Sequence, residues 1–156
     1  MVLAVGKVKE RFYKEALVEY AKRLSAYIQL EIVEVADEPS PESPSPAEIA
    51  RVQDAEGQHL VRHLRDRDGI ILLDITGRAM DSVAWSIKYE SLCAESFGRL
   101  VFVIGGSHGI AAAIRQRAHF RWSFGPLTLP HQLARVVLLE QLYRGVRIAR
   151  GEPYHK

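Results

Sequence analysis

The sequence contains a single cysteine, Cys93, among 156 residues. One cysteine excludes an internal disulfide and a cysteine-based metal cluster. Long apolar runs are also missing, since stretches such as Gly69–Leu73 and Leu100–Ile104 are far shorter than the roughly 20 residues of a membrane-spanning helix. The opening VLAVG resembles a strand and lacks the basic and apolar regions of a signal peptide. We therefore expect a cytoplasmic protein with no membrane partner.

The usual nucleotide-binding fingerprints are absent as well. The glycine-rich segment Gly105–Gly109 (GGSHG) follows an apolar strand, but it lacks both the GxGxxG spacing and the Lys-Ser/Thr of a P-loop. Its glycines either let a ligand approach the backbone or form a tight turn without a ligand. Ser107 and Ser123 lack a His–Asp partnership and a G-x-S-x-G elbow, which disfavours a serine hydrolase.

Four further polar positions allow two interpretations each. His59 and His63 have the i,i+4 spacing of metal ligands, but no HExxH motif accompanies them, so a partly exposed helix face is favoured and no metal is expected. Asp74 at a strand end is either catalytic or holds its loop by hydrogen bonds, and we favour the second. His131, which follows Pro130 at a helix start, either caps the helix or packs there.

Positive charge is concentrated in the last third of the chain. Residues Ala111–Lys156 hold eight Lys and Arg against two Asp and Glu, whereas Met1–Ile110 hold thirteen against seventeen. A basic segment of this kind fits a polyanion such as nucleic acid. It also fits a solvated surface, or a basic face that meets an acidic one in an oligomer, so charge alone leaves these alternatives open.

Apolar strands alternate with helices along the whole chain, which predicts one α/β domain with a mainly parallel sheet over residues 1–156. A capping box begins one helix at Ser45 and Glu48, and Gly98 is expected just beyond the end of another. The predicted strands are Met1–Val5, Gln29–Val35, Gly69–Ile75, Leu100–Ile104 and one before PLTLPH. The predicted helices are Glu10–Tyr27, Ser45–Arg65, Asp81–Ser96, a short alanine-rich segment and His131–Arg150.

Three loops of this arrangement follow strands and are expected at one edge of the sheet. They are Asp74–Gly77, which overlaps the predicted loop Thr76–Arg78, followed by Gly105–Gly109 and Phe124–Pro130. Ligands of open α/β sheets bind at the carboxyl ends of the strands. The sequence therefore predicts a small-molecule site between these loops.

The last helix carries more apolar surface than a small monomer needs, which predicts a self-association face. Its polar side includes Glu140 and Arg144 as an i,i+4 pair. Arg144, Arg147 and Arg150 are spaced to line up along the solvated side. The chain then ends in Pro153-Tyr154-His155-Lys156, a segment rich in functional groups.

The combination of Gly105-Gly106, the segment TLPH at Thr128–His131, EQLYR at Glu140–Arg144 and the terminal PYHK identifies a resemblance. The chain resembles the RlmH-type ribosomal RNA large-subunit methyltransferases of the SPOUT class, over its whole length from AVGK at Ala4–Lys7. It departs from the usual pattern of that family at Ser107-His108 and Phe124-Gly125. These departures affect loops that use backbone more than side chain.

The resemblance implies an α/β fold with a C-terminal trefoil knot, an exception to the usual unknotted topology. It implies transfer of a methyl group from S-adenosylmethionine to N3 of a pseudouridine in 23S rRNA, on assembled ribosomes. It also implies a homodimer in which the partner's C-terminal tail completes each site. The alternatives are a non-enzymatic ribosome-binding factor, a SPOUT methyltransferase for another RNA base, and a nucleotide enzyme with an open Rossmann fold.

Carried over by position, the resemblance implies two groups of site residues. Those expected to bind the cofactor are Leu73, Gly105, Phe124, Gly125, Pro126, Leu127, Thr128 and Leu129. Those expected beside the target base are Arg144, Tyr154 and His155. A cation such as Arg144 would favour the deprotonated, nucleophilic imide, and His155 is the hypothesis for the base that accepts the proton.

Overall fold

A computed structural model of the chain, which describes residues 1–154, contains a five-stranded sheet in which every neighbouring pair of strands is parallel. The strands are β1 (Val2–Val5), β2 (Ile32–Val35), β3 (Asp68–Ala79), β4 (Arg99–Ile104) and β5 (Phe120–Ser123). Their order across the sheet is β2-β1-β4-β3-β5. The expectation of an α/β fold with a parallel sheet is confirmed.

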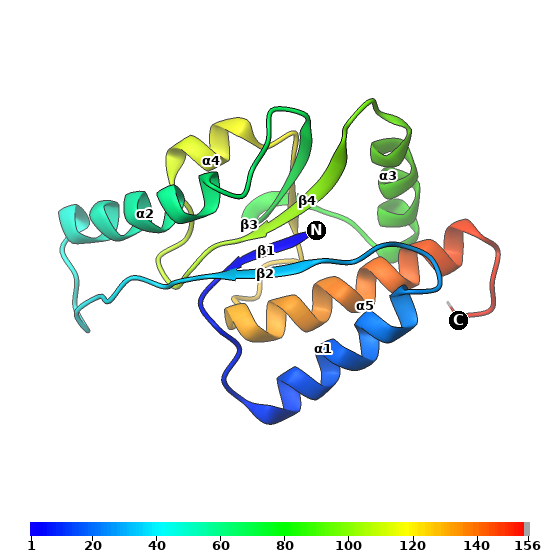
Figure 1. Cartoon of the computed structure of the whole chain (residues 1–156), viewed down its shortest axis with the longest axis horizontal. Helices are drawn as coiled ribbons and strands as arrows, with labels where there is room; N and C mark the ends of the chain where they lie inside the picture. Colours follow the sequence, from blue (N-terminus) through cyan, green and yellow to red (C-terminus); the bar gives the residue numbers. More distant parts are fainter. Residues whose placement is uncertain (155–156) are drawn as a thin grey trace.

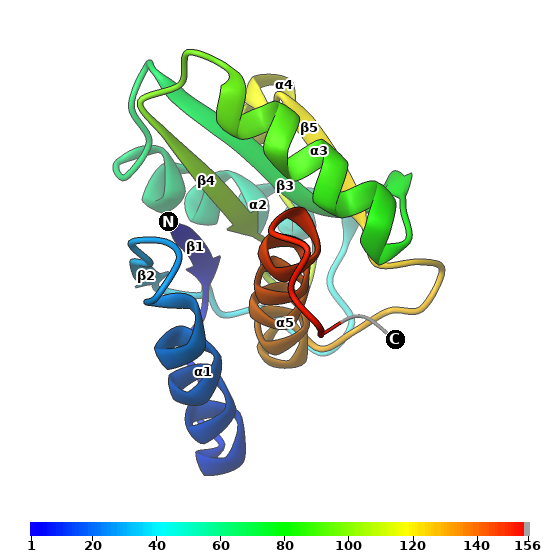
Figure 2. The ribbon, with the colours of Figure 1, turned by 90° about the vertical axis from the view of Figure 1, so that its right-hand side faces the viewer.

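Five helices cover both faces of this sheet (Figure 1). They are α1 (Arg11–Leu24), α2 (Pro46–Val61), α3 (Ser82–Ala94), α4 (Ala112–Arg117) and α5 (His131–Ala149). Helices α1, α3 and α5 lie on one face and α2 and α4 on the other, as the turned view in Figure 2 also shows. None of the helices within residues 1–154 is long and apolar enough to cross a membrane.

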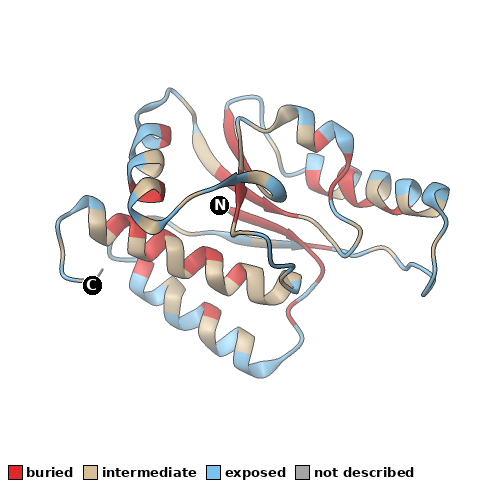
Figure 3. Cartoon of the chain, turned by 180° about the vertical axis from the view of Figure 1, so that it is seen from behind, coloured by how far each residue is buried: buried red, intermediate tan, exposed pale blue. Residues whose placement is uncertain are grey.

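Strand β1, strand β4 after Arg99 and the part of β3 at Gly69–Leu73 are apolar because both faces of the sheet are covered, each by its own core. Along β4, Phe102 and Ile104 join the core beneath α1, α3 and α5, whereas Val101 and Val103 join the core beneath α2 and α4. This alternation follows from the two-residue repeat of a strand. The buried positions, red in Figure 3, accordingly fill the sheet and the inward sides of the helices.

The first residues of α2 and α3 agree with the capping residues in the sequence, because a cap depends only on residues next to each other in the chain. The predicted capping box is present: the Ser45 side chain accepts from the Glu48 N–H, and the Glu48 carboxylate accepts from the Ser45 N–H. Asp81 caps α3 by accepting from the Ala84 N–H at 2.7 Å. The prediction for Gly98 is wrong, since α3 ends at Ala94 with Glu95 as its cap and the Gly98 N–H donates instead to the Arg67 carbonyl.

The prediction of Thr76–Arg78 as a loop is also wrong, because β3 runs on to Ala79. The chain bulges out of the ladder after Leu73 and rejoins it at Arg78, so that both residues pair with Trp122 of β5. Gly77 permits this close approach, since a Cβ there would lie 2.7 Å from the Arg121 carbonyl carbon. A bulge followed by renewed pairing has no signature in the residue pattern.

Candidate functional site

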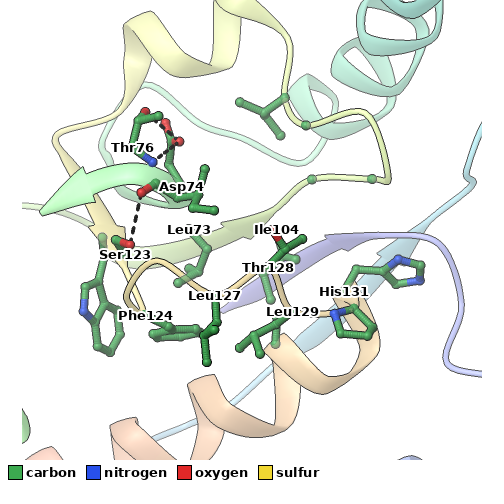
Figure 4. A pocket seen from close by; sticks show the side chains of 18 of the residues that line it. Leu73, Asp74, Thr76, Ile104, Ser123, Phe124, Leu127, Thr128, Leu129 and His131 are labelled. Atoms are coloured by element: carbon green, nitrogen blue, oxygen red, sulfur yellow. Dashed lines mark hydrogen bonds between the residues drawn. The ribbon is translucent and has the colours of Figure 1, made fainter. Parts of the chain in front are cut away.

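Three chain segments converge at the carboxyl edge of the sheet and enclose a cavity of about 640 Å³ (Figure 4). They are the bulged part of β3 at Leu73–Thr76, the glycine-rich turn after β4 at Gly105–Gly109, and the loop Phe124–Pro130 after β5. The N-terminus of α5 closes the cavity through His131 and Ala134. The expectation that these loops lie near one another is confirmed.

The cavity combines apolar side chains with loop backbone. Leu73, Ile104 and Leu129 line it, and Leu127 does so while 76% exposed. Backbone N–H and C=O groups of the two loops supply polar partners at fixed positions, which is the composition of a typical small-molecule cavity. The site therefore suits a flat, apolar ring that carries hydrogen-bonding groups at its edge.

Glycines shape both loops. Gly125 has a φ of +106°, a left-handed conformation that residues with a Cβ rarely adopt. At Gly105, a Cβ would lie 2.5 Å from the carbonyl oxygen of Gly109, so the turn could not close. With glycine at this position the turn closes, and the Gly109 N–H donates to the Gly106 carbonyl at 3.1 Å.

A charged cluster holds the β3 side of the cavity. The Asp74 carboxylate accepts from the Thr76 N–H at 3.0 Å and the Thr76 hydroxyl at 2.9 Å. It also pairs with Arg115 at 2.7 Å and Arg121 at 3.0 Å, although its side chain is only 5% exposed. Burial opposes ionisation of Asp74, but these partners outweigh it and lower the pKa of the carboxyl. The favoured reading of Asp74, that it holds its loop, is confirmed.

The residues expected to bind the cofactor gather around this cavity. Leu73, Gly105, Phe124, Gly125, Leu127, Thr128 and Leu129 all line it. Pro126 lies in the same loop but does not line the cavity, and it is exposed. Cofactor binding by these residues stays a prediction.

Arg144 and Tyr154 lie elsewhere, toward the far end of α5. The Arg144 guanidinium donates to the Glu140 carboxylate at 2.6 Å and stacks over the Tyr154 ring at 4.7 Å from its centroid. The hydrogen bond with Glu140 raises the pKa of Arg144, which keeps the side chain charged. Neither residue lines the cavity, and Arg144 lies roughly 15 Å beyond Ala134 along the helix axis at about 1.5 Å per residue. His155, the hypothesis for the base, lies outside the described residues.

The expectation of three aligned, solvated arginines is wrong in part. Arg144 and Arg147 are half-buried, and Arg147 donates to the Tyr143 hydroxyl at 2.6 Å and pairs with Glu152. Arg150 is exposed, with its guanidinium 4.7 Å from the centre of the Tyr27 ring. Helical spacing correctly predicts that these residues share one side of α5. The segment that follows α5 packs back onto this side and covers Arg144 and Arg147.

Two buried charged residues near the cavity were missed. Arg135 is only 1% exposed, and it donates to the carbonyls of Val5 and Gly6 and to the Glu34 carboxylate. Glu56 of α2 is 4% exposed. Its four-residue spacing from Val52 and Leu60, both core residues, was the signal that could have found it.

The other candidates lie in or next to α2, the glycine-rich turn, β5 and α5. Ser123 accepts from the Gly125 N–H at 3.1 Å, and Ser107 is exposed in the glycine-rich turn. His59 is half-buried with its Nδ1 3.3 Å from the Ala36 carbonyl, and His63 is exposed. Across residues 1–154, no three His, Cys, Asp or Glu side chains are grouped so that they could hold a metal. His131 packs against the cavity, and Pro130 is the residue at the cap position of α5.

Comparison with known proteins places the chain in a class of methyltransferases. The family described as "Predicted SPOUT methyltransferase" matches residues 1–155, and the chain belongs to this family. The expectation of an enzyme of the methyltransferase class is thereby confirmed.

Individual relatives agree with this membership. The chain is 49% identical to "Ribosomal RNA large subunit methyltransferase H" of Desulfitobacterium hafniense (strain DSM 10664 / DCB-2), over 99% of this chain and 97% of that protein. It is 43% identical to the protein of the same name from Streptococcus gordonii, over 99% and 98%. Among solved structures, a probable methylase family protein from Haemophilus influenzae Rd KW20 shares the fold, with a TM-score of 0.51 and 11% identity over 99% of this chain and 69% of that one.

Proposed function

We propose that the protein transfers a methyl group from S-adenosylmethionine to N3 of a pseudouridine in 23S rRNA of the large ribosomal subunit. The substrate is the assembled ribosome in the cytoplasm, and the working form is a homodimer with a trefoil-knotted chain. The observation that carries the proposal is the 49% identity, over 99% of the chain, to a relative named as a ribosomal RNA large subunit methyltransferase.

The cavity fits the proposed methyl donor in size and chemistry. Its volume of about 640 Å³ falls within the range of small-molecule sites, roughly 300–1,000 Å³. Leu73, Leu127 and Leu129 would enclose the adenine ring, while loop backbone would read its edge. When bound, S-adenosylmethionine supplies an electrophilic methyl group on its sulfonium, so neither a metal nor a covalent protein intermediate is needed. The task of the protein is then to align the nucleophile with that group.

The side chains proposed beside the target base supply charge and contact. The imide N3 of pseudouridine becomes a nucleophile only when its proton leaves, and a nearby guanidinium such as that of Arg144 favours the anion. Tyr154 offers an aromatic face next to that guanidinium. His155 is the proposed base.

A second copy of the chain would bring these two groups together. Within one chain, Arg144 and Tyr154 do not line the cavity, and they lie toward the opposite end of α5 from His131 and Ala134. Two chains that pack with α5 against the cavity loops of the partner would place the tail of one copy beside the cavity of the other. This separation supports a homodimer with composite sites.

The direct test incubates the purified protein with labelled S-adenosylmethionine and intact ribosomes, and then maps the modified nucleotide by mass spectrometry. The expected product is one N3-methylated pseudouridine in 23S rRNA. Label in tRNA, or in free rRNA only, would contradict the specific reaction. Absence of cofactor binding in calorimetry would instead favour a non-enzymatic ribosome-binding factor.

A further inference from the structure

A second, smaller cavity of about 310 Å³ adjoins the first. It lies beyond the carboxyl ends of β1 and β4, where the following helices α1 and α4 leave to opposite faces of the sheet, which is a topological switch point. Gly106, Ser107 and His131 line both cavities. A ligand in the first cavity could therefore extend into the second.

The second cavity is acidic. Asp37, Glu38 and Glu56 line it, and the only other titratable side chains along its described wall are His108 and His131. Burial, together with the nearby Arg135, lowers the pKa of His131, so its ring is neutral at pH 7 and does not offset these carboxylates. The cavity therefore favours a ligand group that carries positive charge.

Glu56 is the side chain that points to such a group. It is 4% exposed, and its Oε1 accepts from the Glu38 N–H at 3.2 Å. Its Oε2 has no hydrogen-bond partner among residues 1–154. A buried carboxylate oxygen without a donor costs free energy, and a ligand donor would remove that cost.

The glycine-rich turn and Glu56 are fitted to each other. A Cβ at Gly106 would lie 2.6 Å from the Glu56 Oε2, so a larger residue there would force the Glu56 carboxyl group to shift. Gln53, one turn earlier in α2, donates to the His108 carbonyl, and the His108 Nε2 lies 2.8 Å from the Ser40 hydroxyl. These contacts hold the glycine-rich turn, which lines both cavities, against Glu56.

We propose that the second cavity receives the amino-acid end of the methyl donor, with its α-ammonium group donating to the Glu56 carboxylate. This inference rests on the proposed function, since it names a subsite for the same cofactor. An ammonium group supplies the missing donor to Oε2 and the positive charge that the cavity favours. Burial raises the pKa of the Glu56 carboxyl group, and a bound ammonium group would favour its ionised form.

The test compares two probes by calorimetry: S-adenosylhomocysteine and its deamino analogue, which lacks only the ammonium group. The wild-type protein is expected to bind the deamino analogue about tenfold to hundredfold more weakly, the range for a charge-assisted hydrogen bond. In the Glu56→Gln variant, which keeps the size of the side chain, S-adenosylhomocysteine should weaken by a similar factor and the difference between the probes should vanish. Asp54→Asn, an exposed change on the same helix, should alter neither affinity.

The outcomes separate this inference from the proposed function. If the wild-type protein binds neither S-adenosylhomocysteine nor S-adenosylmethionine, both are overturned. If it binds S-adenosylhomocysteine but treats the deamino analogue equally, the ammonium subsite alone is overturned, and this comparison needs no variant. A penalty for the deamino analogue that persists unchanged in Glu56→Gln would assign the ammonium to another partner and also contradicts the inference.

Discussion

The two ends of α5 are built in different ways. At its N-terminus, around His131 and Ala134, the cavity is formed by loop backbone, glycines and apolar side chains. Toward its C-terminus, a cluster of charged and aromatic side chains gathers around Arg144 and Tyr154, with Glu140 accepting from Arg144. The N-terminal end of α5 thus adjoins a cavity with a mostly apolar lining. The C-terminal end carries charged side chains and aromatic rings.

In the proposed reaction, cofactor binding and chemistry would take place at different ends of α5. The lining of the cavity comes from one chain, and its volume is that of a small-molecule site. A cluster of arginine and tyrosine side chains at a helix end can only act on a substrate that is brought to it. In the proposed homodimer, changes at the cavity end should therefore alter cofactor affinity, and changes at the cluster should alter turnover.

The largest effect is expected from Arg144→Ala. Loss of a guanidinium that stabilises the developing charge should lower kcat on the order of 10²–10³-fold. The affinity for S-adenosylhomocysteine should stay unchanged, since Arg144 does not line the cavity. Single-turnover methyl transfer to ribosomes and calorimetry measure the two quantities, with Arg51→Ala, an exposed arginine of α2, as the control. An equal loss of cofactor affinity would break the proposed division between the two ends.

A smaller effect, on stability, is expected at Asp74. Because the folded-state pKa of Asp74 lies below its ordinary value of 3.8, its ionic contacts stabilise the protein above about pH 4 and are lost as the pH falls through the folded-state pKa. At pH 7 the Asp74→Asn variant should be less stable by about 2 kcal/mol, a typical value for charged hydrogen bonds. Urea unfolding at several pH values should show this difference shrinking as the pH falls below about 4. A difference that is independent of pH would contradict the charged role of Asp74.

The smallest effect is expected from Leu127→Ser. The side chain is 76% exposed, so the free energy of unfolding should change by less than about 0.5 kcal/mol. Covering a leucine with a ligand is worth about 1.5 kcal/mol, so the affinity for S-adenosylhomocysteine should fall by about tenfold. Val18→Ser, at a 69% exposed position of α1 away from the cavity, is the matched control and should leave affinity unchanged. Unaltered binding by Leu127→Ser would remove the Phe124–Pro130 loop from the proposed contact with the cofactor.

Local patterns predicted the elements and the meeting of the three loops. Strand periodicity, the capping box at Ser45 and the chain order suffice for this, because parallel strands carry their following loops to the same edge of the sheet. The bulge of β3 before Arg78 escaped prediction, since it depends on re-pairing with Trp122. The trefoil knot stays a prediction from the resemblance, because periodicity defines elements and not how the chain threads between them.

The burial of charged side chains was also not predicted from the sequence. Arg135 was not singled out from the sequence, yet its two terminal nitrogens donate to the Glu34 carboxylate and to two carbonyls at the end of β1. Only the tertiary arrangement brings those acceptors to α5. The half-buried Arg144 and Arg147 were misjudged for a similar reason, since the segment after α5 returns onto the helix.

The most direct test of composite sites mixes two inactive variants. Arg144→Ala keeps the cavity, whereas Gly105→Ala puts a Cβ 2.5 Å from the Gly109 carbonyl oxygen and should abolish cofactor binding. If each site takes its cavity from one chain and its Arg144 from the other, a heterodimer of the two variants has one intact site. Random exchange makes half of the dimers heterodimers, so the mixture should recover about a quarter of the wild-type activity. Methyl transfer by the exchanged mixture that stays at the sum of the separate variants would contradict a site shared between two copies.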